Sequence, residues 1–155
     1  MIHKKLCGYL AIFCIFLLTT SCFDFLTNSK GTRYEGITVT NEMNEILSVD
    51  PDDWGCSSPI IPTDSTSGLP SSFCFGTAYP NPASDEAIIP FTIPERSYVK
   101  IWVKNNSDFS IVLHSDTMSP GNYNLGWDCS KVSSGIYRIF IETSSWHEHG
   151  DILVQ

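Results

Sequence analysis

Short stretches in which apolar and polar residues alternate fill the second half of the chain, from residue 73 onward. Val99, Ile101 and Val103 alternate with polar or charged residues, and Tyr123 and Trp127 stand in a similar stretch. Successive residues of a β-strand point to opposite faces, so this period of two predicts strands with one buried face. Turn residues separate the stretches at intervals of about eight to twelve positions, the spacing of an all-β sandwich or barrel.

The pattern predicts about seven strands. They cover residues 73–78, 88–93, 98–104, 111–113, 121–128, 136–143 and 151–154. Strands with one buried and one solvated face are typical of antiparallel sheets. The sequence therefore predicts an all-β domain over residues 73–155, built as an antiparallel β-sandwich.

Several motifs occur in a fixed order across these strands. They are Tyr79-Pro80-Asn81-Pro82, Ile89-x-Phe91-x-Ile93-Pro94-Glu95, Val99-x-Ile101-x-Val103, Gly121-x-Tyr123-x-Leu125-x-Trp127-Asp128 and Ser134-Gly135-Ile136-Tyr137. In this order they resemble the immunoglobulin-like domain of the flagellar hook-capping protein. They equally resemble the related C-terminal sorting domain of the bacterial type IX secretion system. The resemblance runs from Tyr79 to Gln155 and implies an immunoglobulin-like sandwich.

The motif residues also have physical reasons to be there. Pro80 and Pro82 hold the entry to the first strand extended, and the second proline restricts Asn81 to the β region. Trp127 is expected as a large core residue, and Asp128 as an acceptor for the amides of the next turn. The other motif residues are Tyr79, which can cover one end of the core, Gly135, which permits a turn, and Tyr137, on the strand face of Ile139 and Ile141.

The departures from these families concern single segments. The loop at 129–133 is shorter than the Gly/Asp-rich loop usual in the hook-capping form, and closer to the sorting-domain form. The last strand lacks the basic residues frequent in sorting domains. Sorting domains also usually follow a large passenger, whereas only an acidic segment precedes this one. A flagellar role is not expected.

The first 21 residues are expected to be a lipoprotein signal peptide. Lys4 and Lys5 supply a positive start, and residues 6–18 form an apolar run, shorter than the roughly 20 residues that span a bilayer. The following Thr19-Thr20-Ser21-Cys22 resembles the lipobox of bacterial lipoproteins, which predicts lipid on Cys22. The alternative is an ordinary secretory peptide that leaves Cys22 as a spare thiol. Either reading predicts export, and the first predicts a chain anchored in the bacterial cell envelope, at the outer membrane.

Residues 22–72 are expected to be an acidic, Ser/Pro-rich and largely irregular spacer. A brief strand is predicted at 36–40 and one or two helical turns at 41–47, with Asn41 as the cap. The acidic run from Asp50 to Asp53 lacks the alternating ligands, central Gly and terminal Glu of a calcium loop, so no metal is expected there. Trp54 is expected to dock the spacer onto the domain.

The charge of the chain excludes one class of partner. The sequence holds nine basic and 17 acidic residues; removal of Lys4 and Lys5 with the signal peptide leaves seven basic residues and a net charge of −10. Such a chain repels nucleic acid and anionic lipid surfaces. The expected contacts are the membrane, through lipid on Cys22, and an envelope protein or the secretion machinery.

Three of the six cysteines remain after removal of the signal and lipidation of Cys22. Cys56 and Cys74 flank the Pro/Ser-rich loop and are the natural disulfide pair in an oxidising compartment. A disulfide that closes this loop stabilises the folded state by about 3 kcal/mol in the chain-entropy model. Free or alternatively paired thiols are the other possibility, because Cys129 could compete.

Catalytic chemistry has little support in the sequence. His147 and His149 fall on one face of a strand and could clip a metal ion, but no third ligand can be assigned and a solvated edge explains them as well. No nucleophile motif surrounds any serine. The chain is therefore expected to be no enzyme and to need no cofactor.

Three functions remain open at this point. The first is a non-enzymatic, membrane-anchored lipoprotein whose sandwich is a structural or binding module of the envelope. The second is type IX secretion cargo in which the sandwich is the sorting signal. A small metal-dependent enzyme comes last.

Overall fold

The computed structural model describes residues 36–56 and 68–155, which form nine β-strands and no helix. The strands are β1 (Val39–Thr40), β2 (Ile46–Ser48), β3 (Cys74–Phe75), β4 (Glu86–Ile93), β5 (Ser97–Asn105), β6 (Ser110–Met118), β7 (Gly121–Asp128), β8 (Gly135–Glu142) and β9 (His147–Val154). In these two ranges, no helix has the length and apolar character needed to cross a membrane.

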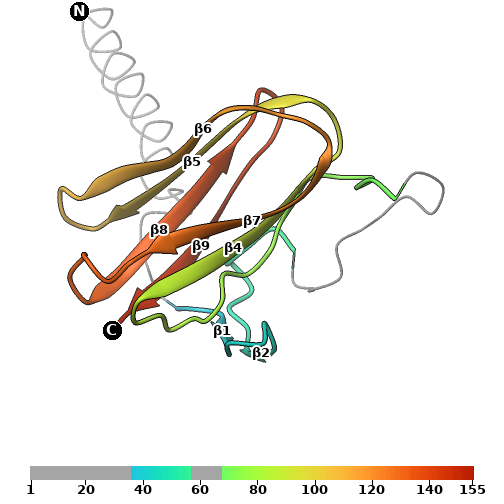
Figure 1. Cartoon of the computed structure of the whole chain (residues 1–155). Coiled ribbons are helices and arrows are strands. Elements are labelled where there is room, and N and C mark those ends of the chain that lie inside the picture. The colour runs from blue at the N-terminus through green and yellow to red at the C-terminus, as the bar shows by residue number, and fades with distance from the viewer. Residues whose placement is uncertain (1–35, 57–67) are drawn as a thin grey trace, which may run out of the picture. The chain divides into compact units, whose positions relative to one another are not determined.

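Two antiparallel sheets pack as layers in the C-terminal part of the chain (Figure 1). The small sheet has the order β3-β4-β7, and the large sheet has the order β6-β5-β8-β9. Strands β3 to β9 number seven, and the predicted immunoglobulin-like β-sandwich is confirmed.

The core lies between the sheets and contains the residues that the alternation assigned to the inner face. Val99, Ile101 and Val103 of β5 are fully buried, and so are Ile139 and Ile141 of β8. Ile101 lies opposite Ile141, and Val103 opposite Ile139. Cross-strand pairs of this kind are the unit of sheet stability, because their side chains touch on the buried face.

Three strands differ most from the prediction. Strand β3 contains only Cys74 and Phe75 of the predicted 73–78. Strand β6 runs to Met118 instead of ending near residue 113, and β9 begins at His147 instead of residue 151. Polar residues occupy most of these added positions, so the apolar alternation that marked the other strands is absent. Main-chain hydrogen bonds to a neighbouring strand hold these added positions in the sheet, because β6 pairs with β5 and β9 pairs with β8 along their whole lengths.

The prediction of helical turns at 41–47 is wrong, because residues 41–45 connect β1 to β2 in a hairpin and residues 46–47 belong to β2. The side-chain oxygen of Asn41 accepts hydrogen bonds from the main-chain N–H groups of Met43 (3.0 Å) and Glu45 (2.9 Å). An Asn side chain that binds the amides after it stabilises a turn as readily as a helix start. Residues 36–56 belong to the same compact unit as the sandwich.

Candidate functional site

A single segment, residues 74–83, joins the two sheets along one side of the sandwich. Near its start, Tyr79 exchanges two main-chain hydrogen bonds with Ile88 of β4, at 2.9 and 2.8 Å. Near its end, the main-chain N–H of Ala83 donates to the carbonyl of Leu153 in β9, at 2.9 Å. The segment therefore begins as an edge of the small sheet and ends as an edge of the large one.

Residues 36–56, which we call the strap, lie against this same side. The main-chain N–H of Cys56 donates to the carbonyl of Phe75 in β3, at 3.1 Å. The N–H of Trp54 donates to the carbonyl of His149 in β9, at 3.0 Å. The strap thus adds hydrogen bonds to the outer edges of both sheets.

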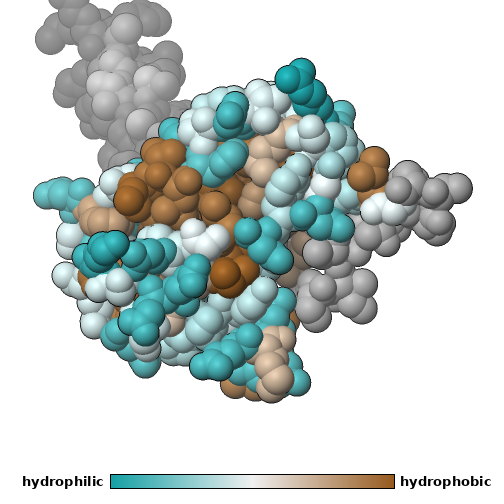
Figure 2. All heavy atoms as spheres, viewed as in Figure 1, coloured by the Kyte–Doolittle hydropathy of each residue, from teal (hydrophilic) through white to brown (hydrophobic). Residues whose placement is uncertain are grey.

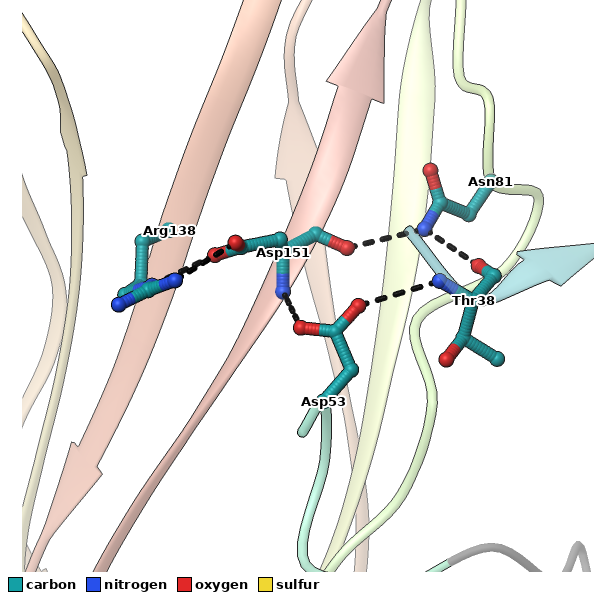
Figure 3. Close-up of polar contacts among 5 residues, drawn as sticks. All are labelled: Thr38, Asp53, Asn81, Arg138 and Asp151. Atoms are coloured by element: carbon teal, nitrogen blue, oxygen red, sulfur yellow. Dashed lines mark hydrogen bonds and ion pairs between the residues drawn. The ribbon is translucent and has the colours of Figure 1, made fainter. Parts of the chain in front are cut away.

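Asn81 of the Tyr79–Pro82 motif ties the strap, the joining segment and the last strand together (Figure 3). Its main chain exchanges two hydrogen bonds with Thr40. Its side-chain N–H₂ donates to the carbonyls of Thr38 (2.7 Å) and Asp151 (3.0 Å), while its side-chain oxygen accepts from the N–H of Leu153 (2.9 Å). Asn81 is fully buried, and only an amide side chain offers two donors and an acceptor in this arrangement.

Asp53 of the strap makes the second buried polar contact with β9. Its two carboxylate oxygens accept hydrogen bonds from the N–H of Asp151 (2.9 Å) and the N–H of Thr38 (3.1 Å). Burial and the negative charge of Asp151 raise the pKa of the Asp53 carboxyl to about 7, although the two main-chain donors partly oppose this rise.

The side chain of Asp151 is held in turn by Arg138 of β8. The guanidinium of Arg138 meets both carboxylate oxygens of Asp151, at 2.7 Å each, and both side chains are almost fully buried. A two-fold contact of this kind fixes the orientation of both groups. Arg138 thereby balances the negative charge of Asp151, which lies close to Asp53 where the strap meets β9.

Trp54 is the apolar end of the strap, and its predicted docking onto the domain is confirmed. It is 7% exposed and belongs to the core, where its ring lies 5.1 Å from that of Phe75. Its main chain has a φ of 59°, a rare value for a bulky residue. A Cβ at Gly150 would overlap the Trp54 ring, so the glycine leaves the space that the indole fills.

A disulfide joins the strap to β3. It links Cys56 and Cys74, as predicted, while Cys129 is a free thiol buried in the core. Burial raises the pKa of the Cys129 thiol. Cys22, the predicted lipid attachment site, lies outside the described residues.

The remaining motif residues make contacts within the sandwich. Trp127 is 3% exposed and packs edge-on against Tyr137 at 5.6 Å. Asp128 accepts hydrogen bonds from the Lys131 ammonium and from the hydroxyl and N–H of Ser130, and these contacts lower its pKa to about 2. Gly135 has a φ of 156° where β8 begins. Tyr79 is half-buried and lies outside the core, and Pro80 and Pro82 follow cis peptide bonds.

The two histidines of β9 do not gather further ligands in the part of the chain that the structure describes. No group of three or more His, Cys, Asp or Glu side chains is found there that could hold a metal ion. His149 lies against the ring of Phe140, and burial lowers its pKa. His147 is exposed.

Sequence reasoning missed the roles of Asp53, Arg138 and Asp151. The acidic run that contains Asp53 was assigned to the irregular spacer, without a metal. The hydrogen-bond partners of Asp53 lie 15 and 98 positions away along the chain, so the sequence did not indicate them. A signal was nevertheless present, because Arg138 stands between the apolar residues of β8 and Asp151 directly precedes the apolar residues Ile152 to Val154 of β9. Opposite charges in neighbouring strands are a common pairing.

Comparison with known families gives a match over the sandwich. A family model described as "Secretion system C-terminal sorting domain" matches residues 77–155, just over half of the chain. No curated protein and no solved structure matches the chain. The match contains Asn81, the Arg138–Asp151 pair and the last strand, and it begins after the strap. The chain therefore belongs to the family of secretion-system C-terminal sorting domains.

Proposed function

We propose that the chain is cargo of the type IX secretion system and that its C-terminal β-sandwich is the sorting signal. The family match over residues 77–155 is the observation that carries this proposal. It favours this function over a membrane-anchored structural lipoprotein, the first of the three possibilities that the sequence left open. The expected destination is the cell envelope or the cell surface.

The proposal assigns a recognition role to the sandwich and no reaction to the chain. The machinery of the secretion system is the expected partner. The buried hydrogen bonds of Asn81 and Asp53 support the role indirectly, because a signal must keep one shape while it is recognised. Lipid on Cys22 stays a separate prediction.

Export of the full chain is the test. The chain would be produced in a bacterium with a type IX system and in a matched strain without one. We expect it at the surface or in the medium only when the system is present. Equal export by both strains would contradict the proposal.

Mass spectrometry of the exported chain separates the two envelope functions. A C-terminus cleaved near Tyr79 would support the sorting signal. A chain that is full-length to Gln155, carries diacylglycerol on Cys22 and stays in the membrane fraction would favour the anchored module instead.

A further inference from the structure

The sandwich is closed on one side and open on the other. The outer edge of β3 is covered by Cys56 of the strap, and the outer edge of β9 by Trp54 of the strap and by Ala83. Strand β6 pairs only with β5, and β7 pairs only with β4. Within residues 36–56 and 68–155, no main-chain hydrogen bond joins the outer edge of β6 or β7 to another segment. Two long strand edges therefore keep unpaired N–H and C=O groups.

An apolar groove of about 410 Å³ lies between these two edges. Phe109, Ile111 and Leu113 line it from the β6 side, and Trp127 and Val132 line it from the β7 side. Ile111 is 44% exposed. Figure 2 shows apolar residues gathered on this face between β6 and β7. Exposed apolar surface that is grouped in one place marks an interaction site more often than scattered residues do.

The segment that flanks the groove carries more acidic than basic residues. Residues 108–132, which contain β6 and β7, hold Asp108, Asp116 and Asp128 against the single basic residue Lys131. Lys131 is already paired with Asp128, at 2.7 Å. Asp108 and Asp116 are exposed, so this segment favours a binding partner with positive charge and disfavours a second copy of the same acidic segment.

We propose that the secretion machinery binds the sandwich by strand addition in this groove. The occupant is an extended segment of a machinery protein, with apolar side chains and flanking Lys or Arg residues. Only an extended chain offers both the alternating hydrogen-bonding groups that the open edges lack and side chains for the groove. This inference rests on the proposed function, and it names the surface that is recognised.

Strand β6 also carries features that oppose pairing with another β6. A register shift interrupts its pairing opposite Ile101 and Trp102, and His114 and Asp116 lie opposite the inward-facing Ile101 and Val99. Irregular edges and inward-pointing charges prevent indiscriminate edge-to-edge association. The stretch from Ser110 to Val112 lacks them, so a partner that matches this stretch can still bind.

The binding test uses a synthetic peptide with alternating Val and Thr between paired lysines, and a matched peptide with glutamates in place of the lysines. Amide hydrogen exchange of the purified chain would be measured with each. We expect slower exchange in β6 and β7 with the lysine peptide, and affinity weaker by about tenfold with the glutamate peptide. No protection, or protection elsewhere, would overturn the proposal. So would protection without peptide that rises with protein concentration, because a second copy would then fill the groove.

Matched variants identify the surface. In Ile111→Lys/Leu113→Lys we expect the protection to disappear. In Met43→Lys/Leu47→Lys, which makes the same charge change at residues 76% and 65% exposed on the strap, we expect it to persist. If the first variant unfolds, Ile111→Thr/Leu113→Thr removes the same apolar contacts with residues suited to an edge strand. Retained protection in the folded groove variant would overturn the proposal.

Export of these variants separates the inference from the proposed function. We expect export of the groove variant to fall by about tenfold or more, while the strap variant is exported like the natural chain. If the natural chain itself does not depend on the type IX system, the proposed function fails. If the natural chain depends on it and the folded groove variant is exported equally well, only the inference fails.

Discussion

Trp54 of the strap fills the space beside Gly150 of β9, where a side chain at residue 150 would overlap the indole. The buried ring also lies 5.1 Å from Phe75 of β3. One aromatic side chain from outside the matched family region therefore packs between strands of both sheets. The strap belongs to the core of the domain, which a short β-sandwich of this size needs, because small domains bury little apolar surface on their own.

Gly150→Ala should therefore destabilise the domain. The added methyl group must displace the Trp54 ring or β9, and overpacking of this kind costs about 1 to 3 kcal/mol. Urea unfolding followed by tryptophan fluorescence would measure the loss. Gly126→Ala on β7 is the matched control, because its Cβ would approach only the movable end of the Glu86 side chain. Equal stability of the two variants would show that Trp54 does not occupy this space.

Loss of the Asn81 side chain should open the contact between strap and sandwich. Asn81→Ala leaves the carbonyls of Thr38 and Asp151 and the N–H of Leu153 without their partner. Each buried group that loses its hydrogen bond costs about 1 to 3 kcal/mol, so the total should exceed about 3 kcal/mol. The Leu153 amide should exchange faster with solvent. Asn124→Ala, at an exposed position of β7, should change neither quantity.

The alternation of apolar residues was enough to predict the sandwich because its strands have one buried face. Seven strands and the core positions of β5 and β8 could be read in this way. The disulfide was predicted from the two cysteines that flank the Pro/Ser-rich loop, and the docking of Trp54 from an aromatic residue in an acidic segment. The ends of β6 and β9 could not be predicted, because their polar residues are held by main-chain hydrogen bonds to a neighbouring strand. Main-chain pairing leaves little trace in the order of side chains.

The contacts between the strap and the sandwich could not be predicted from the sequence for a related reason. For Asn81 the sequence predicted only a backbone that Pro82 restricts to the β region, yet the Asn81 side chain bonds to residues 43 and 70 positions away. Asp53 stood in an acidic run that resembled a solvated spacer. Contacts between polar residues that are distant in the sequence form only in the folded chain, and no local sequence pattern predicts them.

Trp127→Ala tests the core itself. Removal of a large aromatic residue that is 3% exposed leaves a cavity, and such changes cost about 3 to 5 kcal/mol. Tyr98→Ala, at a position 52% exposed on the outer face of the large sheet, should cost much less. Chemical unfolding measures both. A loss under about 1 kcal/mol for the tryptophan variant would mean that Trp127 is not part of the core.

Opening of the disulfide tests how firmly the strap is fastened. Cys56 and Cys74 are 18 positions apart, and a cross-link over a loop of this length stabilises by about 3 kcal/mol in the chain-entropy model. Cys56→Ser/Cys74→Ser should lose about this amount in chemical unfolding. Addition of a reductant to the natural chain should have the same effect, and should leave the stability of the variant unchanged. An equal response of both proteins to the reductant would contradict the assignment.

Titration of Asp53 should make the stability of the domain depend on pH. The pKa of Asp53 is about 7 in the folded chain, above the ordinary value of 3.8, so the folded state binds more protons than the unfolded state between these two values. The contribution of Asp53 to stability is therefore complete below about pH 4 and is lost as the pH rises through 7. Asp53→Asn removes the titration, so the free energy of unfolding of the natural chain minus that of the variant should fall over this window and become constant above it.

Asp128→Asn is the opposing control. Lys131 and Ser130 hold the pKa of Asp128 at about 2, so the contribution of Asp128 to stability is present above about pH 4 and is lost as the pH falls toward 2. Urea unfolding at a series of pH values measures both, and a constant difference for Asp53→Asn from pH 4 to 7 would show that the strap carboxyl does not titrate there.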